Sequence, residues 1–114
     1  MNLQIQKYRN DINVMHDTAK QITKDFGLEE GSILISGDPQ NAYSELELQL
    51  IPVISDLYSG RSADLMNLLY RIDVNESQIK KALAVSDPKG VVIMLTGLIL
   101  EREFIKCVTR KVYS

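Results

Sequence analysis

The sequence is poor in the residues that build metal sites and disulfides. Its 114 residues include one cysteine, Cys107, and one histidine, His16, and no tryptophan. A lone cysteine forms no intramolecular disulfide, and one residue of each kind is too few for a Cys/His zinc site. We therefore expect no metal, no cofactor and a reducing, cytoplasmic compartment.

Long hydrophobic runs are missing too. The longest, residues 91–100, is only about half as long as the roughly 20 residues that a bilayer-spanning helix needs. Polar and charged residues interrupt positions 1–25, so this stretch does not resemble a signal peptide. We expect no association with a membrane.

The common catalytic and nucleotide-binding motifs are absent as well. The chain has no phosphate-binding glycine loop, no HExxH zinc motif, no EF-hand loop and no GxSxG nucleophile motif. Its composition is 45% hydrophobic and 25% charged with three prolines, which is typical of a folded globular chain. The length fits one domain, residues 1–114, and we expect it not to be an enzyme.

The N-terminal quarter shows a helical repeat of apolar residues. They step by three and four positions, as on one face of a helix: Ile5, Tyr8, Ile12, Met15, Ala19, Ile22 and Phe26. This spacing predicts one long first helix. Gly27 is placed to end it in the left-handed conformation that glycine adopts without a steric cost.

Residues 32–36 read Ser-Ile-Leu-Ile-Ser between two glycines, which fits two structures. The run has the length and composition of a short strand, which would need a partner strand, for example one across a dimer axis. No second strand is evident in the sequence. We favour an irregular segment that places Ile33 and Ile35 on the helical core.

Capping signals divide the rest of the chain into helices. One helix starts either at Asp38 with Pro39 or at Ser44, continues through Pro52 with a bend near Ile51, and ends at Gly60. A short helix follows over residues 62–72. Asn75 caps a brief helix, and Asp87 with Pro88 opens the longest one, which extends to about residue 112. The sequence thus predicts an all-α bundle of about five helices, with the first and last helices long.

The apolar run at 91–100 is hydrophobic on every side of its helix, so it has to be enclosed. Either the other helices wrap around it or it lies in a homodimer interface. In the second case, the predicted interface residues are Val91, Met94, Leu95 and Leu98.

Charge is unevenly distributed along the chain. Residues 28–60 contain no basic residue and six acidic ones: Glu29, Glu30, Asp38, Glu45, Glu47 and Asp56. A surface of one sign would attract a basic protein partner, although solvated loop charges and a helix N-terminus also account for these residues. Nucleic-acid binding is disfavoured because the sequence pI is about 5.3.

Charged residues also flank the buried-looking segments. Glu101, Arg102 and Glu103 follow the apolar run directly, so at least one of them should point inward and need an ionic partner. Arg71 and Asp73 are the candidates for that partner. Together Arg71, Asp73, Glu101 and Glu103 would form either a structural tie or the lining of a ligand pocket or small active site between helices.

Two segments carry a resemblance to known proteins. Residues 68–74, LLYRIDV, and residues 98–113, LILEREFIKCVTRKVY, resemble stretches of small uncharacterised helical bacterial proteins with no known activity. The resemblance implies a bacterial, cytosolic origin and transfers no site residue. We therefore expect a non-enzymatic interaction module that self-associates, the alternative being the small enzyme or ligand-binding protein just described.

Overall fold

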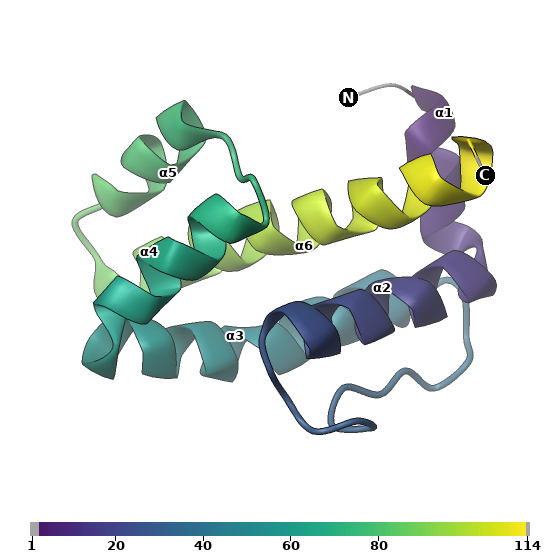
Figure 1. The fold of residues 1–114 in the computed structure, drawn as a ribbon, viewed down its shortest axis with the longest axis horizontal. Helices are drawn as coiled ribbons and strands as arrows, with labels where there is room; N and C mark the ends of the chain where they lie inside the picture. Colours follow the sequence, from purple (N-terminus) through teal and green to yellow (C-terminus); the bar gives the residue numbers. More distant parts are fainter. Residues whose placement is uncertain (1–2, 114) are drawn as a thin grey trace. The chain divides into compact units, whose positions relative to one another are not determined.

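The computed structural model describes residues 3–113, and within that range the chain is all-helical, as predicted (Figure 1). A 3-10 helix, Lys7–Asn10, accompanies six α-helices, and the described residues contain no strand. The α-helices are α1 (Leu3–Gln6), α2 (Ile12–Asp25), α3 (Ala42–Gly60), α4 (Ser62–Arg71), α5 (Glu76–Leu83) and α6 (Pro88–Tyr113). None of these helices is long and apolar enough to cross a bilayer.

The described residues group into two compact units. Unit 1 contains residues 3–46 and 103–113, and unit 2 contains Glu47–Arg102. Helices α3 and α6 each contribute to both units, whereas α2 belongs to unit 1 and α4 and α5 belong to unit 2. The assignment of the whole chain to one domain stays a prediction.

In unit 1, the predicted continuous first helix is wrong. Asp11 has an extended backbone, with φ −91° and ψ 106°, and its carboxylate accepts hydrogen bonds from the amides of Asn13 and Val14. A new helix, α2, therefore begins after the 3-10 helix. The Asp11 side chain accepts from amides that would otherwise lack a partner at the helix start, which favours a helix that begins here over one that continues through Asp11. Met15 and Ile22 from the apolar repeat are nevertheless buried.

The end of α2 matches the prediction. Gly27 has a φ of 65°, its amide donates to the carbonyl of Lys24, and the amide of Leu28 donates to that of Thr23. These two bonds form a Schellman motif, in which a glycine in the left-handed conformation satisfies the last carbonyls of a helix.

The segment between α2 and α3 is an irregular loop, so the strand alternative for residues 32–36 does not hold (Figure 1). Ile33 is buried, Ile35 is half-buried and Leu34 is exposed. The loop is fastened to the first turn of α3, where the Ser36 amide donates to the Glu45 carboxylate at 2.9 Å.

Helix α3 begins at Ala42, between the two starts that the sequence favours. Asp38 instead caps the turn before it, where the amide of Gln40 donates to its carboxylate at 3.0 Å. The helix continues through Pro52 to Gly60. In unit 1 its first turn places Tyr43 edge-on against Phe104 of α6, with ring centroids 5.7 Å apart.

In unit 2, the predicted caps form as expected. The Asn75 side chain accepts from the Gln78 amide at 3.1 Å, and the Asp87 side chain accepts from the Lys89 amide at 3.2 Å. Helix α6 then extends over 26 residues, about 39 Å at 1.5 Å per residue. The fully buried side chains of this unit include Leu50, Ile54, Leu65, Leu69, Ile72, Leu95, Ile99 and Leu100.

Candidate functional site

The apolar run of α6 is covered on one side only. Of the predicted interface residues, Val91 and Leu95 are buried in the chain itself, Leu98 is half-buried and Met94 is 43% exposed. The neighbouring Ile93 is 56% exposed. Enclosure by the other helices is therefore incomplete, and Ile93 and Met94 form the uncovered part of the run.

A groove lies beside these residues in unit 2. Its volume is about 510 Å³. It is lined from α3 and α6 by Ile51, Ser55, Tyr58, Ser59, Pro88, Lys89, Val92 and Ile93. Lys89 is the one charged residue among them. Most of the lining is apolar, so a groove of this kind is suited to bind an apolar surface.

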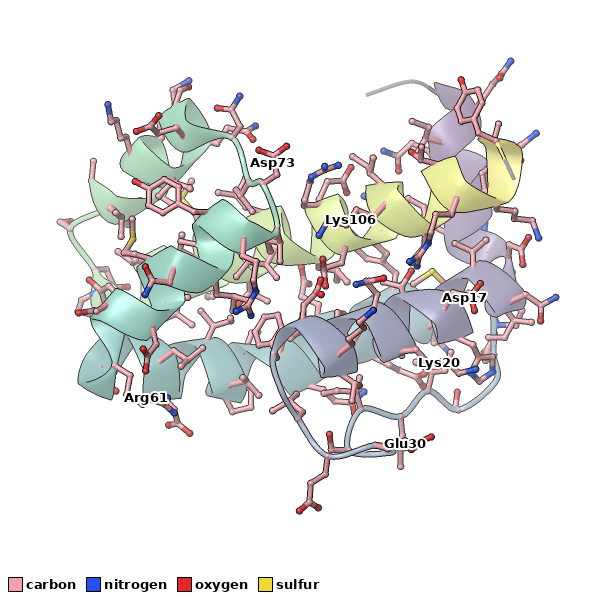
Figure 2. All side chains as sticks on the ribbon, in the orientation of Figure 1. Asp17, Lys20, Glu30, Arg61, Asp73 and Lys106 are labelled. Atoms are coloured by element: carbon pink, nitrogen blue, oxygen red, sulfur yellow. The ribbon has the colours of Figure 1, made fainter. Side chains whose placement is uncertain are left out.

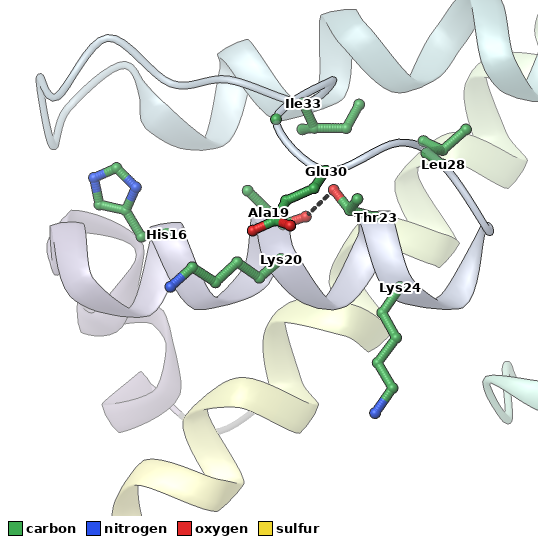
Figure 3. Close-up of a pocket in the computed structure, with 9 residues that line it drawn as sticks. His16, Ala19, Lys20, Thr23, Lys24, Leu28, Glu30 and Ile33 are labelled. Atoms are coloured by element: carbon green, nitrogen blue, oxygen red, sulfur yellow. Dashed lines mark hydrogen bonds between the residues drawn. The ribbon is translucent and has the colours of Figure 1, made fainter.

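Unit 1 has an open pocket of about 490 Å³ between α2 and the loop that follows it (Figure 3). Leu28, Ile33 and Ala19 supply its apolar wall. The Thr23 hydroxyl is engaged, because it donates to the Ala19 carbonyl at 2.8 Å. Lys20, Lys24 and Glu30 give the pocket charges of both signs, His16 also lines it, and Lys24 points away from Leu28 and Ile33 (Figure 3). This mixture selects no class of ligand.

A buried charged cluster joins α2 to α6 in unit 1. The Glu103 side chain has no exposed surface, and its Oε1 lies 3.2 Å from Lys106 Nζ. The same Nζ lies 3.5 Å from Asp25 Oδ2. Gln21 completes the cluster by donating to Asp25 Oδ1 at 2.9 Å. Two carboxyl groups, of which Glu103 is fully buried and Asp25 partly buried, thus lie on either side of one partly buried ammonium group.

The electrostatics of the two carboxyl groups differ. Burial, followed by the hydrogen bond with Asp25 and its negative charge, raises the pKa of Glu103 to about 7, although Lys106 acts in the opposite direction. Burial would also raise the pKa of Asp25, but the hydrogen bonds from Glu103 and Gln21 and the charge of Lys106 hold it below its usual value. Near neutral pH Glu103 is the group that gains or loses a proton.

The four predicted ligand-binding residues are divided between the units. Arg71, Asp73 and Glu101 belong to unit 2 and Glu103 to unit 1, and none of them lines the pockets described above. Asp73 lies on the loop between α4 and α5 (Figure 2). Its ionic partner is Arg102, whose Nη2 lies 3.6 Å away and whose Nε donates to the Ile72 carbonyl at 3.1 Å.

The expectation that one residue after the apolar run points inward is confirmed by Glu103. It contacts Asp25 and Lys106, whereas Arg71 was the partner that the sequence suggested. Sequence reasoning missed Asp25, which is distant along the chain. One signal was available: an acid in the last turn of a helix opposes the helix dipole, so its presence there indicates a specific partner.

The remaining candidate groups have structural partners. Cys107 is buried, which raises the pKa of its thiol, and Arg110 Nη2 lies 3.2 Å from its sulfur. Arg110 Nη1 donates to the Gln21 side chain at 2.7 Å, so two cations of α6, Lys106 and Arg110, are engaged within unit 1. No group of three potential metal ligands occurs within residues 3–113.

Comparisons with protein-family models, with characterised proteins and with solved structures find no match to this chain. Unit 2 contributes an exposed apolar surface, and unit 1 contributes a buried charged cluster.

Proposed function

We propose that the chain is a non-enzymatic protein–protein interaction module that forms a homodimer through the uncovered side of α6 in unit 2. The observation that carries this proposal is the exposure of Ile93 and Met94 within an apolar run whose other residues are buried or half-buried. Neighbouring large apolar side chains on a well-formed helix gain free energy when another surface removes them from water. The adjacent groove provides a surface that such side chains can enter.

A second copy of the chain is the occupant that this surface suits best. In a twofold dimer the same patch lies on both subunits, so it must be self-complementary in shape and charge. The groove and Ile93 adjoin each other on α3 and α6, so each copy offers a recess together with a projecting side chain. Lys89 is the one charged residue of the lining, which limits the repulsion between like surfaces.

Light scattering on three proteins tests the proposal. Ile93→Glu places a charge on the patch, and Tyr70→Glu is its matched control, because Tyr70 of α4 is 58% exposed, close to the 56% of Ile93, and does not line the groove. Burying an unpaired carboxylate in an apolar interface costs several kcal/mol. We expect a dimer for the wild type and for Tyr70→Glu at micromolar concentration, and a monomer for Ile93→Glu.

Circular dichroism of all three proteins shows whether the fold is retained. The proposal fails if the wild type is a monomer throughout the micromolar range. It also fails if a folded Ile93→Glu protein dimerises as strongly as Tyr70→Glu does, since the patch would then lie outside the interface.

For the acidic segment we propose a basic protein partner, held by unit 1. Glu29, Glu30 and Asp38 are exposed on the loop before α3, and no basic residue occurs between positions 28 and 60. Glu45 contributes less, because its carboxylate accepts a hydrogen bond from the Ser36 amide, which lowers its pKa.

We also propose that the protein lies in the cytoplasm, where a free cysteine stays reduced.

A lysine-rich peptide serves as the probe for this second surface. We expect it to bind the wild type with an affinity that falls as salt is added, and to bind the double variant Glu29→Gln with Glu30→Gln more weakly. Asp17→Asn on α2 removes one exposed charge elsewhere in the unit and is the control. Equal binding to the double variant and to the control would contradict this proposal.

A further inference from the structure

Four residues of α6 form one row on the surface of this helix in unit 2. Lys89, Ile93, Gly97 and Glu101 follow one another at intervals of four, and residues at this spacing lie beside each other along a helix. Lys89 and Ile93 are exposed, and Gly97 and Glu101 are half-buried. The row therefore carries a cation at one end, an acid at the other, and a large apolar side chain beside a glycine in the middle.

The two glycines of α6 differ in what surrounds them. A carbon added at Gly90 would lie 2.8 Å from Cγ1 of Val85, so the chain itself uses the space there. At Gly97 an added carbon would meet no atom within 4 Å, apart from its chain neighbours and the backbone of its own helix. Glycine within a helix is less favourable than alanine, and no packing contact within residues 3–113 requires one at position 97. The surface above Gly97 is thus open to a side chain from another molecule.

We propose that two copies pack α6 antiparallel along this row, so that Ile93 of each copy covers Gly97 of the other and Lys89 of each faces Glu101 of the other. This inference rests on the dimer proposed above and adds its orientation and register. Rows at a spacing of four fit beside each other when two helices cross, which is the commonest helix packing in globular proteins. Positions 89 and 101, like 93 and 97, are equidistant from position 95, so a twofold axis beside that position pairs them in both directions.

The charges of the row favour the antiparallel orientation. In a parallel pair the twofold axis runs along the helices, so Lys89 would meet Lys89 and Glu101 would meet Glu101. The antiparallel pair instead places each ammonium group near a carboxylate of the other copy. A carboxylate accepts several hydrogen bonds, so the contacts of Glu101 within its own chain do not prevent this one. The cation next to it, Arg102, is engaged in its own chain, with Nη2 3.6 Å from Asp73 Oδ2.

Gly97→Leu tests the contact between Ile93 and Gly97. The first carbon of the added side chain has free space in its own chain, but the side chain occupies the place that Ile93 of the other copy needs. Ala63→Leu, at an exposed position of α4 in the same unit, is the matched control. In sedimentation velocity over a range of concentrations, we expect the wild type and Ala63→Leu to dimerise equally. Gly97→Leu should keep its circular dichroism spectrum and dimerise at least about tenfold more weakly.

Charge reversal tests the orientation in the same assay. Lys89→Glu and Glu101→Lys each bring like charges together in the antiparallel pair, so each should weaken the dimer about tenfold at low salt. The double variant restores opposite charges and should dimerise like the wild type. In a parallel pair like charges meet in all four proteins, so the single variants would not weaken the dimer.

The outcomes separate this inference from the proposed dimer. A monomeric wild type contradicts both. If Ile93→Glu disrupts the dimer but Gly97→Leu dimerises like Ala63→Leu, the register is wrong and the dimer stands. The orientation is wrong if the single charge reversals change nothing, or if the double variant does not recover what they lose. Should Gly97→Leu not fold, the charge series decides, and should Glu101→Lys not fold, Gly97→Leu and Lys89→Glu decide.

Discussion

Two buried threonines give a prediction in which the same substitution has opposite effects. Thr18 of α2 and Thr96 of α6 both have no exposed surface. The Thr18 hydroxyl donates to the carbonyl of Val14 at 2.8 Å. The Thr96 hydroxyl, by contrast, has no hydrogen-bond partner among the described residues. One buried hydroxyl is satisfied and the other is not.

The size of the two effects follows from this difference. A buried hydroxyl without a partner costs about 1–3 kcal/mol relative to water, and a satisfied one contributes about 1 kcal/mol. Valine has the size of threonine and a similar helix propensity. We expect Thr96→Val to raise the free energy of unfolding by about 1 kcal/mol and Thr18→Val to lower it by about 1 kcal/mol.

Urea unfolding followed by circular dichroism measures both values. With a slope of about 1–3 kcal/mol per molar urea, 1 kcal/mol moves the midpoint by roughly 0.5 M, upward for Thr96→Val and downward for Thr18→Val. If Thr96→Val destabilises the protein, or if both midpoints move in the same direction, the assignment of the two hydroxyl groups is refuted.

Two further predictions concern the ends of α2, and the same urea assay checks both. Asp11→Ala removes the side chain that caps the helix start and should cost about 1 kcal/mol, whereas Asp17→Ala, at an exposed position within the helix, should change little. Gly27→Ala should also cost about 1 kcal/mol, because alanine is strained at a φ of 65°. Apart from the neighbouring residues, no atom lies within 4 Å of the added carbon, so the cost comes from the backbone conformation and not from a clash. An unchanged urea midpoint for Asp11→Ala would contradict the N-cap assigned to Asp11. An unchanged midpoint for Gly27→Ala would contradict the left-handed helix end assigned to Gly27.

The features that the sequence predicts correctly are those that neighbouring residues determine. Gly27 at the end of α2, Asn75 before α5 and Asp87 before α6 each act through atoms a few residues away. The break at Asp11 was missed because the apolar repeat passes through it. The apolar side chains before and after Asp11 can face the same side of the chain although Asp11 itself is extended. The apolar repeat therefore does not prove a continuous helix.

The candidate sites depend on contacts between distant segments, which a single sequence does not determine. The pattern at 91–100 shows that the run is apolar, but it does not show which side the chain itself covers. The partner of Glu103 likewise depends on how α2 packs on α6. Local charge spacing pointed to Arg71, whereas the packing of unit 1 brings Asp25 and Lys106 to the Glu103 carboxyl.

Peroxide oxidation of Met94 in the wild-type protein tests most directly whether a second copy covers this face of α6. Exposed methionine sulfur is oxidised readily, so its rate reports how far water and peroxide reach it. Met15, which is fully buried, and half-buried Met66 on α4 are internal references. We predict that raising the protein concentration slows the oxidation of Met94 and leaves Met66 unchanged. A Met94 rate that is the same at every concentration would contradict self-association through α6.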